Sequence, residues 1–84
     1  MMTCMWRELK GEIVYRFQTD EKDIANKMKR RQKFDLVSWG VNCPLWIYTA
    51  GFSRPDLARA ALKSLTGRKI VFNAEEEIYY AEGK

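Results

Sequence analysis

Histidine is absent from the chain, which disfavours most kinds of catalytic and metal-binding site. Histidine is the commonest general base and metal ligand in proteins, and a Cys–His pair is impossible without it. The two cysteines alone do not make up a zinc ligand set. The chain also has neither a glycine-rich phosphate loop nor a nucleophile elbow. The sequence therefore predicts a protein that is not an enzyme and that uses no metal and no cofactor.

Cysteines and long apolar runs are also scarce. Cys4 and Cys43 are too few to staple a small secreted fold, so we expect two reduced thiols. The segment from Met1 to Lys10 carries charges at Arg7 and Glu8, unlike a signal peptide. No stretch has the length needed to cross a bilayer. These patterns predict a cytoplasmic protein without a membrane partner.

The composition is that of one globular domain. The 84 residues are 46% hydrophobic and include three Trp, four Tyr and four Phe, which suffices for one core and leaves no room for a second. We expect 1–84 to be a single domain, with 12–81 as its core and 1–11 as an N-terminal extension or extra strand. The acidic run Glu75–Glu77 is expected to be a solvated turn, because a cation site needs oxygens that converge from several directions.

The first half of the core has the pattern of a strand followed by a helix. In Glu12–Gln18, β-branched and aromatic residues alternate, which predicts a strand with Tyr15 and Phe17 on one face and Arg16 on the other. Residues 20–32 have apolar side chains at helical spacing. The side chains that share one side of this predicted helix are Ile24, Ala25 and Met28.

A hairpin is predicted next, because strand-like segments at 34–41 and 45–52 flank the turn residues Asn42–Pro44. In the expected register, Trp46 and Tyr48 face away from the helices, while Trp39 faces them. A slip of one residue would exchange these two faces.

A second helix is predicted from Ser53, with Pro55 in its first turn and Gly67 as a left-handed C-terminal cap. Its expected buried stripe consists of Leu57, Ala58, Ala61, Leu62 and Leu65. Two short strand signals follow at 69–73 and 77–81. The resulting order, β-α-β-β-α-β, predicts the ferredoxin-like α+β arrangement, an antiparallel sheet with both helices on one face.

Positive charge is concentrated in the two predicted helices. The net charge is +4. Residues 22–33 contain six basic side chains and one acid, and residues 54–69 contain five basic side chains and one acid. The C-terminal end reverses the sign with Glu75–Glu77 and Glu82. Such polarity favours a polyanionic partner for the basic helices.

One segment resembles a known family. The run PDLARAALKSLTGRKI (residues 55–70) is similar to the second half of RNA recognition motif domains, in which an alanine-rich helix ends in Leu-x-Gly. The spacing of Trp46 and Tyr48 matches the paired aromatics of the third strand in that family. Val14 stands where the first strand of the family has another aromatic, and Leu45 replaces the glycine that precedes the pair. The resemblance implies a ferredoxin-like fold and an RNA-binding sheet face.

The expected function is non-catalytic binding of nucleic acid, with RNA favoured. Trp46 and Tyr48 would stack on bases, and Arg16 and Tyr79 would flank them. Phosphates would meet the basic helices through Lys27, Arg30, Arg31, Arg59 and Lys63. In this arrangement the basic helices lie on the side of the sheet opposite the aromatic pair, so one ligand could not easily reach both.

The alternative is a protein-interaction module, a small inhibitor or adaptor that binds an acidic protein surface or forms a homodimer through the open sheet face.

Overall fold

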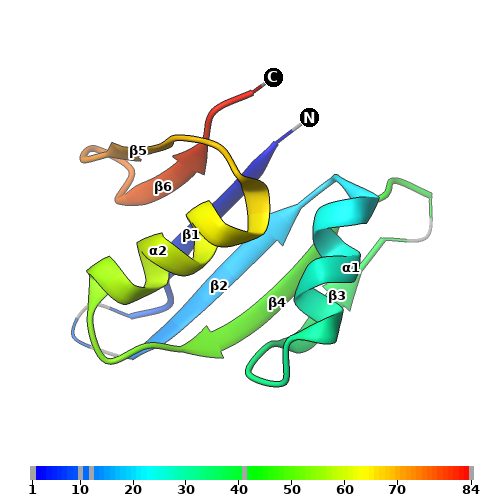
Figure 1. Ribbon diagram of the computed structural model, residues 1–84, viewed down its shortest axis with the longest axis horizontal. Coiled ribbons are helices and arrows are strands. Elements are labelled where there is room, and N and C mark those ends of the chain that lie inside the picture. The colour runs from blue at the N-terminus through cyan, green and yellow to red at the C-terminus, as the bar shows by residue number, and fades with distance from the viewer. Residues whose placement is uncertain (1, 10, 12, 41, 84) are drawn as a thin grey trace.

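The computed structural model describes residues 2–9, 11, 13–40 and 42–83 (Figure 1). Glu12 and Val41, the outer ends of two predicted strands, lie outside these residues. Within the described residues, six strands and two helices follow one another in the order ββαββαββ. Their bounds are β1 Thr3–Arg7, β2 Val14–Thr19, α1 Lys22–Arg30, β3 Asp35–Trp39, β4 Trp46–Gly51, α2 Pro55–Thr66, β5 Ile70–Asn73 and β6 Ile78–Ala81.

The strands form one six-stranded antiparallel sheet in the order β3-β4-β2-β1-β6-β5. Figure 1 shows both helices on the same face of this sheet. The α+β class and the shared helix face are as predicted. The element order differs from a strict ferredoxin-like one, because β1 forms the extra N-terminal strand that was the alternative for residues 1–11, and because the two strand signals at 69–73 and 77–81 form separate strands, β5 and β6. β1 is inserted between β2 and β6, so the N-terminal segment is a central strand of the sheet.

The pairing register assigns each strand residue to one face, since direct cross-strand partners point the same way. Phe17 of β2 is paired with Met5 of β1 and with Tyr48 of β4, and all three are buried on the face that the helices cover. The neighbouring residue Arg16 is paired with Trp6 and with Thr49. Those three side chains therefore lie on the other face, which we call the open face.

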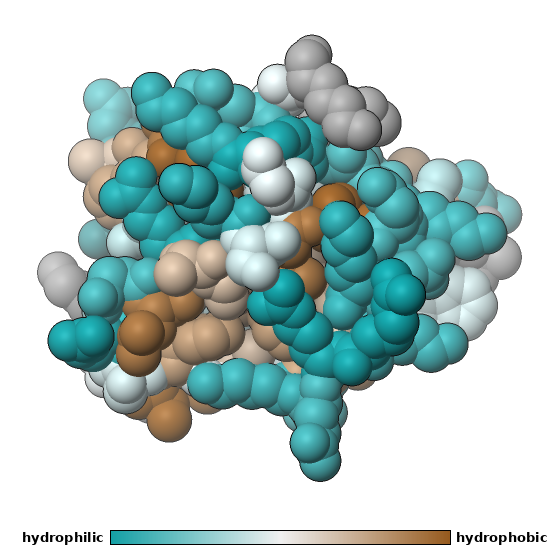
Figure 2. Space-filling model, viewed as in Figure 1, coloured by the Kyte–Doolittle hydropathy of each residue, from teal (hydrophilic) through white to brown (hydrophobic). Residues whose placement is uncertain are grey.

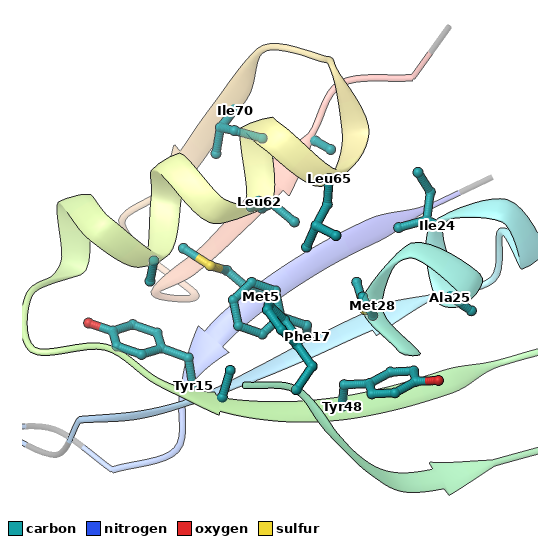
Figure 3. Packing of buried hydrophobic residues seen from close by; sticks show 14 residues of the cluster. Met5, Tyr15, Phe17, Ile24, Ala25, Met28, Tyr48, Leu62, Leu65 and Ile70 are labelled. Atoms are coloured by element: carbon teal, nitrogen blue, oxygen red, sulfur yellow. The ribbon is translucent and has the colours of Figure 1, made fainter. Parts of the chain in front are cut away.

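The core fills the space between the sheet and the two helices, with Met5 and Phe17 at its centre (Figure 3). The stripe predicted for α1 is confirmed: Ile24, Ala25 and Met28 are all buried. In α2 the buried residues are Ala58, Leu62 and Leu65. Leu57 is 40% exposed, so its prediction as a core residue was wrong. At about 100° per residue, it lies roughly 100° away from Ala58 around the helix.

The C-terminal end of α2 leads into a buried polar cluster at one end of the sheet. Gly67 caps the helix in the left-handed conformation, with φ of 66°, as its position in the sequence predicts. The next residue, Arg68, forms a buried ion pair with Glu21. Thr3 donates a hydrogen bond to the same Glu21 carboxylate at 2.6 Å. The cluster thereby connects the loop after α2 with β1 and with the residue that precedes α1.

Candidate nucleic-acid interface

Trp46 and Tyr48 lie on the helix-covered face, so the predicted outward orientation of this pair was wrong. β4 pairs with β2 so that Trp46 is opposite Thr19 and Tyr48 is opposite Phe17. Tyr48 is only 4% exposed, and Figure 3 shows its ring between α1 and β4. Burial raises the pKa of the Tyr48 phenol. A ring in this position is part of the core and is not a free surface for a base.

Trp39 reaches the same side of the sheet through an irregularity in β3. Leu36 is paired with Tyr48 and Trp39 is paired with Trp46, and the register shifts between Leu36 and Ser38. A bulge of this kind interrupts the simple alternation of faces, so residues three apart can point the same way. Trp39 faces the helices as predicted, but the prediction that it lies inside the core, on the face opposite to Trp46, was wrong. It is 58% exposed and is the cross-strand partner of Trp46 on β3, the edge strand of the sheet.

These residues form a groove between α1 and the β3–β4 hairpin, which we call the tryptophan groove. Its volume is about 350 Å³. It is lined by Ala25, Asn26 and Lys29 of α1, Phe34, Asp35, Leu36 and Trp39 at β3, and Trp46 and Tyr48 of β4. Trp39 and Trp46 are direct cross-strand partners, so their indole rings start from neighbouring positions on one wall. Asn26 and Lys29 supply polar groups on the opposite wall.

A shallow depression on α1 continues from the groove. It is lined by Asn26, Lys29 and Arg30, of which the first two also line the tryptophan groove. Figure 2 shows that the helix side of the molecule is largely hydrophilic. Three ion pairs occur among the described residues: Arg16 with Glu8, Arg54 with Asp56, and Arg68 with Glu21. Lys29 and Arg30 belong to none of them.

The other basic residues predicted to contact phosphate lie along the helices outside the groove. Lys27 and Arg31 point toward α2, since Lys27 Nζ lies 3.5 Å from the Leu65 carbonyl oxygen and Arg31 Nη2 donates to Ser64 Oγ at 2.9 Å. Arg59 Nη2 donates to the Ile70 carbonyl oxygen at 3.2 Å. Lys63 is exposed in the last turn of α2.

The two residues predicted to flank the aromatic pair lie elsewhere. Arg16 is on the open face, where it is ion-paired with Glu8. Tyr79 is on the helix side near the opposite edge of the sheet, and its ring packs against Phe72 with centroids 4.5 Å apart. Neither residue lines the tryptophan groove.

Asn26, Lys29 and Trp39 line the groove but were not among the residues predicted to bind a ligand. Trp39 has the spacing of a core residue, but it lies on an edge strand. Lys29 lies at the margin of the basic helix face, where it is indistinguishable from other solvated lysines. The open face likewise carries aromatics, Trp6 and Tyr80, which belong to strands at the centre of the sheet.

The part of the chain that the structure describes has two further properties that bear on function. There, neither helix has the length and apolar character needed to span a membrane. The same residues contain no cluster of three or more Cys, Asp or Glu side chains arranged to hold a metal ion. A comparison with models of known protein families, with curated proteins and with solved structures finds no match for this chain.

Proposed function

We propose that this protein binds single-stranded nucleic acid, with RNA as the favoured ligand, in the tryptophan groove. One observation carries the proposal: Trp39 and Trp46 are cross-strand partners in the same groove as Asn26 and Lys29. Exposed rings and basic groups that face one channel are the combination by which proteins hold unpaired strands.

Base stacking is the first part of the interaction. Trp39 is 58% exposed and offers a ring face to a base, while Trp46 is partly buried against the core and stiffens the wall beside it. Stacking of a base on an aromatic side chain contributes about 1–3 kcal/mol. A base within a duplex already stacks on its neighbours, so the groove favours unpaired strands.

The polar wall supplies the second part. Lys29 and Arg30 follow the groove onto the surface of α1, where they can neutralise successive phosphates. The Asn26 side chain has both a donor and an acceptor for the edge of a base. Because Trp39, Trp46 and α1 lie on one side of the sheet, a single strand can reach the rings and the basic residues together.

The binding test is a fluorescence-anisotropy titration of a labelled, mixed-sequence single-stranded RNA at several salt concentrations. For roughly three to five phosphate contacts, the logarithm of the affinity should fall with that of the salt concentration with a slope of about −2 to −3.5. Single-stranded DNA and duplex RNA of equal length serve as competitors, and the duplex should compete least.

Three variants locate the site. Trp39→Ala should weaken binding by about 1–3 kcal/mol. Lys29→Gln should reduce the magnitude of the salt slope by about 1. Lys69→Gln is the matched control, since Lys69 adjoins β5 at the opposite edge of the sheet.

Binding without a salt slope, or equal effects of Lys29→Gln and Lys69→Gln, would contradict the proposal. Polyglutamate is included as a competitor, because the alternative partner is an acidic protein surface. A different outcome is that polyglutamate displaces the RNA at equal charge while Trp39→Ala has no effect on binding. That result would mean that the basic side chains bind any polyanion without base stacking, and it would favour a protein partner.

A further inference from the structure

The open face of the sheet has an apolar centre. Cross-strand pairing places Cys4 beside Tyr80 and Trp6 beside Ile78 on this face. A hollow of about 370 Å³ lies there, and Trp6 and Tyr80 are among the residues that line it. Cys4 is only 4% exposed although both helices lie on the other face, so neighbouring side chains of the open face already shield its thiol.

Charged groups of opposite sign flank this centre. Arg16 lies on β2, on one side of β1, where Glu8 is its ion-pair partner within the chain. Glu76 lies on the other side, where its carboxylate accepts a hydrogen bond from the Tyr80 hydroxyl at 3.2 Å and lines the hollow. Desolvation of the ring, with a smaller contribution from the Glu76 carboxylate, raises the pKa of Tyr80. An acid at this position disfavours a nucleic-acid strand on the open face.

We infer that a second copy of this chain covers the open face, packed sheet against sheet about a twofold axis parallel to β1. Such an axis places β2 of one copy over β6 of the other. Arg16 of each copy then faces Glu76 of the second copy, and the two Trp6 side chains meet near the axis. The Arg16–Glu76 contact forms twice in this arrangement, with Arg16 shared between Glu8 of its own chain and Glu76 of the second copy, which fits a second copy better than an unrelated surface.

The open face is large enough for a stable interface with a second copy of the chain. The molecule measures 33 and 26 Å along its two longer axes, and the sheet is seen face-on along the shortest one (Figure 1). A stable interface buries about 800 Å² on each partner, which a face of these dimensions can supply. Two sheets packed in this way lie about 10 Å apart, close enough for Trp6 and Tyr80 to interdigitate.

Sedimentation equilibrium over a wide range of protein concentration measures the association. We expect the unmodified chain to dimerise and Arg16→Glu to weaken dimerisation about tenfold, because it sets two acids against each other. Glu76→Arg should have a similar effect, and the double variant Arg16→Glu/Glu76→Arg should restore the dimer. Lys63→Glu, an equal charge reversal on the helix side, should leave the dimer unchanged.

Two outcomes would overturn the inference. One is a monomer at every concentration, and the other is a dimer that neither open-face variant weakens. The double variant separates a lost contact from a misfolded chain, since only the contact is rescued by exchanging the charges. Failure here is distinct from failure of the nucleic-acid proposal, because the tryptophan groove lies on the other face and Arg16→Glu should leave RNA binding unchanged.

Discussion

Trp39 and Tyr48 line the same groove but differ greatly in exposure. Trp39 is 58% exposed on an edge strand, whereas Tyr48 is 4% exposed beneath α1. Trp39 has a neighbouring strand on one side only, whereas Tyr48 has a strand on each side and packs in the core with residues of α1. At the scale of single residues, one ring is therefore available to a ligand and the other holds the groove in place.

We predict that removing these two rings has very different effects on the free energy of unfolding. Tyr48→Ala should lower the free energy of unfolding by about 3–5 kcal/mol, because it leaves a cavity in the core. Trp39→Ala should change it by no more than about 0.5 kcal/mol, as exposed positions usually do. Urea denaturation of the two variants measures both values. Similar losses for the two variants would contradict this assignment of rings to core and surface.

The cysteines differ in the same way. Burial, with a smaller contribution from the Glu76 carboxylate, raises the pKa of the Cys4 thiol from 9.0 to about 11. Cys43 is exposed in the β3–β4 turn. The thiolate is the reactive form of cysteine, so burial and protonation both protect Cys4.

Iodoacetamide labelling at pH 8, followed by peptide mass spectrometry, should modify Cys43 and leave Cys4 nearly untouched. With a pKa of about 11, the thiolate fraction of Cys4 at pH 8 is on the order of one in a thousand. Because the unfolded chain loses this proton at lower pH than the folded one, stability should be full below pH 9.0 and fall as the pH rises toward 11. Cys4→Ala should remove that part of the pH dependence. Equal labelling of the two thiols would contradict the prediction.

At the scale of elements, the β3–β4 hairpin decides the shape of the groove. The Gly40 amide donates to the Leu45 carbonyl oxygen at 2.9 Å, which closes the hairpin directly after Trp39. A Cβ atom added to Gly40 would lie against the backbone carbonyl oxygen of Cys43, well inside contact distance. Glycine is required here because backbone cannot move aside as a flexible side chain can.

Gly40→Ala should therefore cost about 1–3 kcal/mol of stability and weaken RNA binding, since the Trp39–Trp46 pair must shift with the hairpin. Gly51→Ala is the control at the other end of β4, where the nearest atoms to an added Cβ, of Ile13, are at 3.9 Å. That change should stay within about 0.5 kcal/mol. Thermal melts measure the stability of the two variants, and the anisotropy titration measures their affinity for RNA. A fully stable Gly40→Ala variant that bound RNA normally would show that the hairpin is not so constrained.

At the scale of the whole molecule, the buried polar cluster connects the C-terminal end of α2 and the N-terminal end of α1 to β1 at one end of the sheet. Thr3 Oγ1 lies 2.7 Å from Thr19 Oγ1 and donates to Glu21, which is ion-paired with Arg68. The Nε and Nη1 atoms of Arg68 are buried without hydrogen-bond partners in the described part of the chain. A buried pair of this kind is costly to break, because the remaining charge stays desolvated.

Arg68→Ala should lower the free energy of unfolding by about 3–5 kcal/mol, since it leaves the Glu21 carboxylate buried and uncompensated. Removing both charges with Glu21→Leu and Arg68→Met should recover much of this loss. Arg54→Ala is the matched control: its pair with Asp56, at 3.4 Å, is exposed at both partners, so the change should cost less than about 1 kcal/mol. Equal losses for Arg68→Ala and Arg54→Ala in denaturant melts would contradict a structural role for the cluster.

The sequence by itself determined the elements whose signals are local. Ile24, Ala25 and Met28 predict the buried side of α1, and Gly67 predicts the end of α2, because helical spacing and a left-handed cap depend on residues within a few positions of one another. The alternation in β2 likewise identifies Tyr15 and Phe17 as core residues. These local signals suffice for the α+β class, and the order of the elements along the chain predicts two helices on one side of the sheet.

Only the tertiary structure decided which face Trp46 occupies and where β1 lies. Trp46, Tyr48 and Ala50 of β4 alternate with Ile47, Thr49 and Gly51, and the pairing with β2 places the Trp46 set on the helix-covered face. The bulge near Val37 then brings Trp39 to the same side. β1 takes its central place through contacts with β2 and with β6, and the pairing with β6 spans most of the chain. Such long-range pairings leave no trace in local spacing, so the groove could not be located before the fold was known.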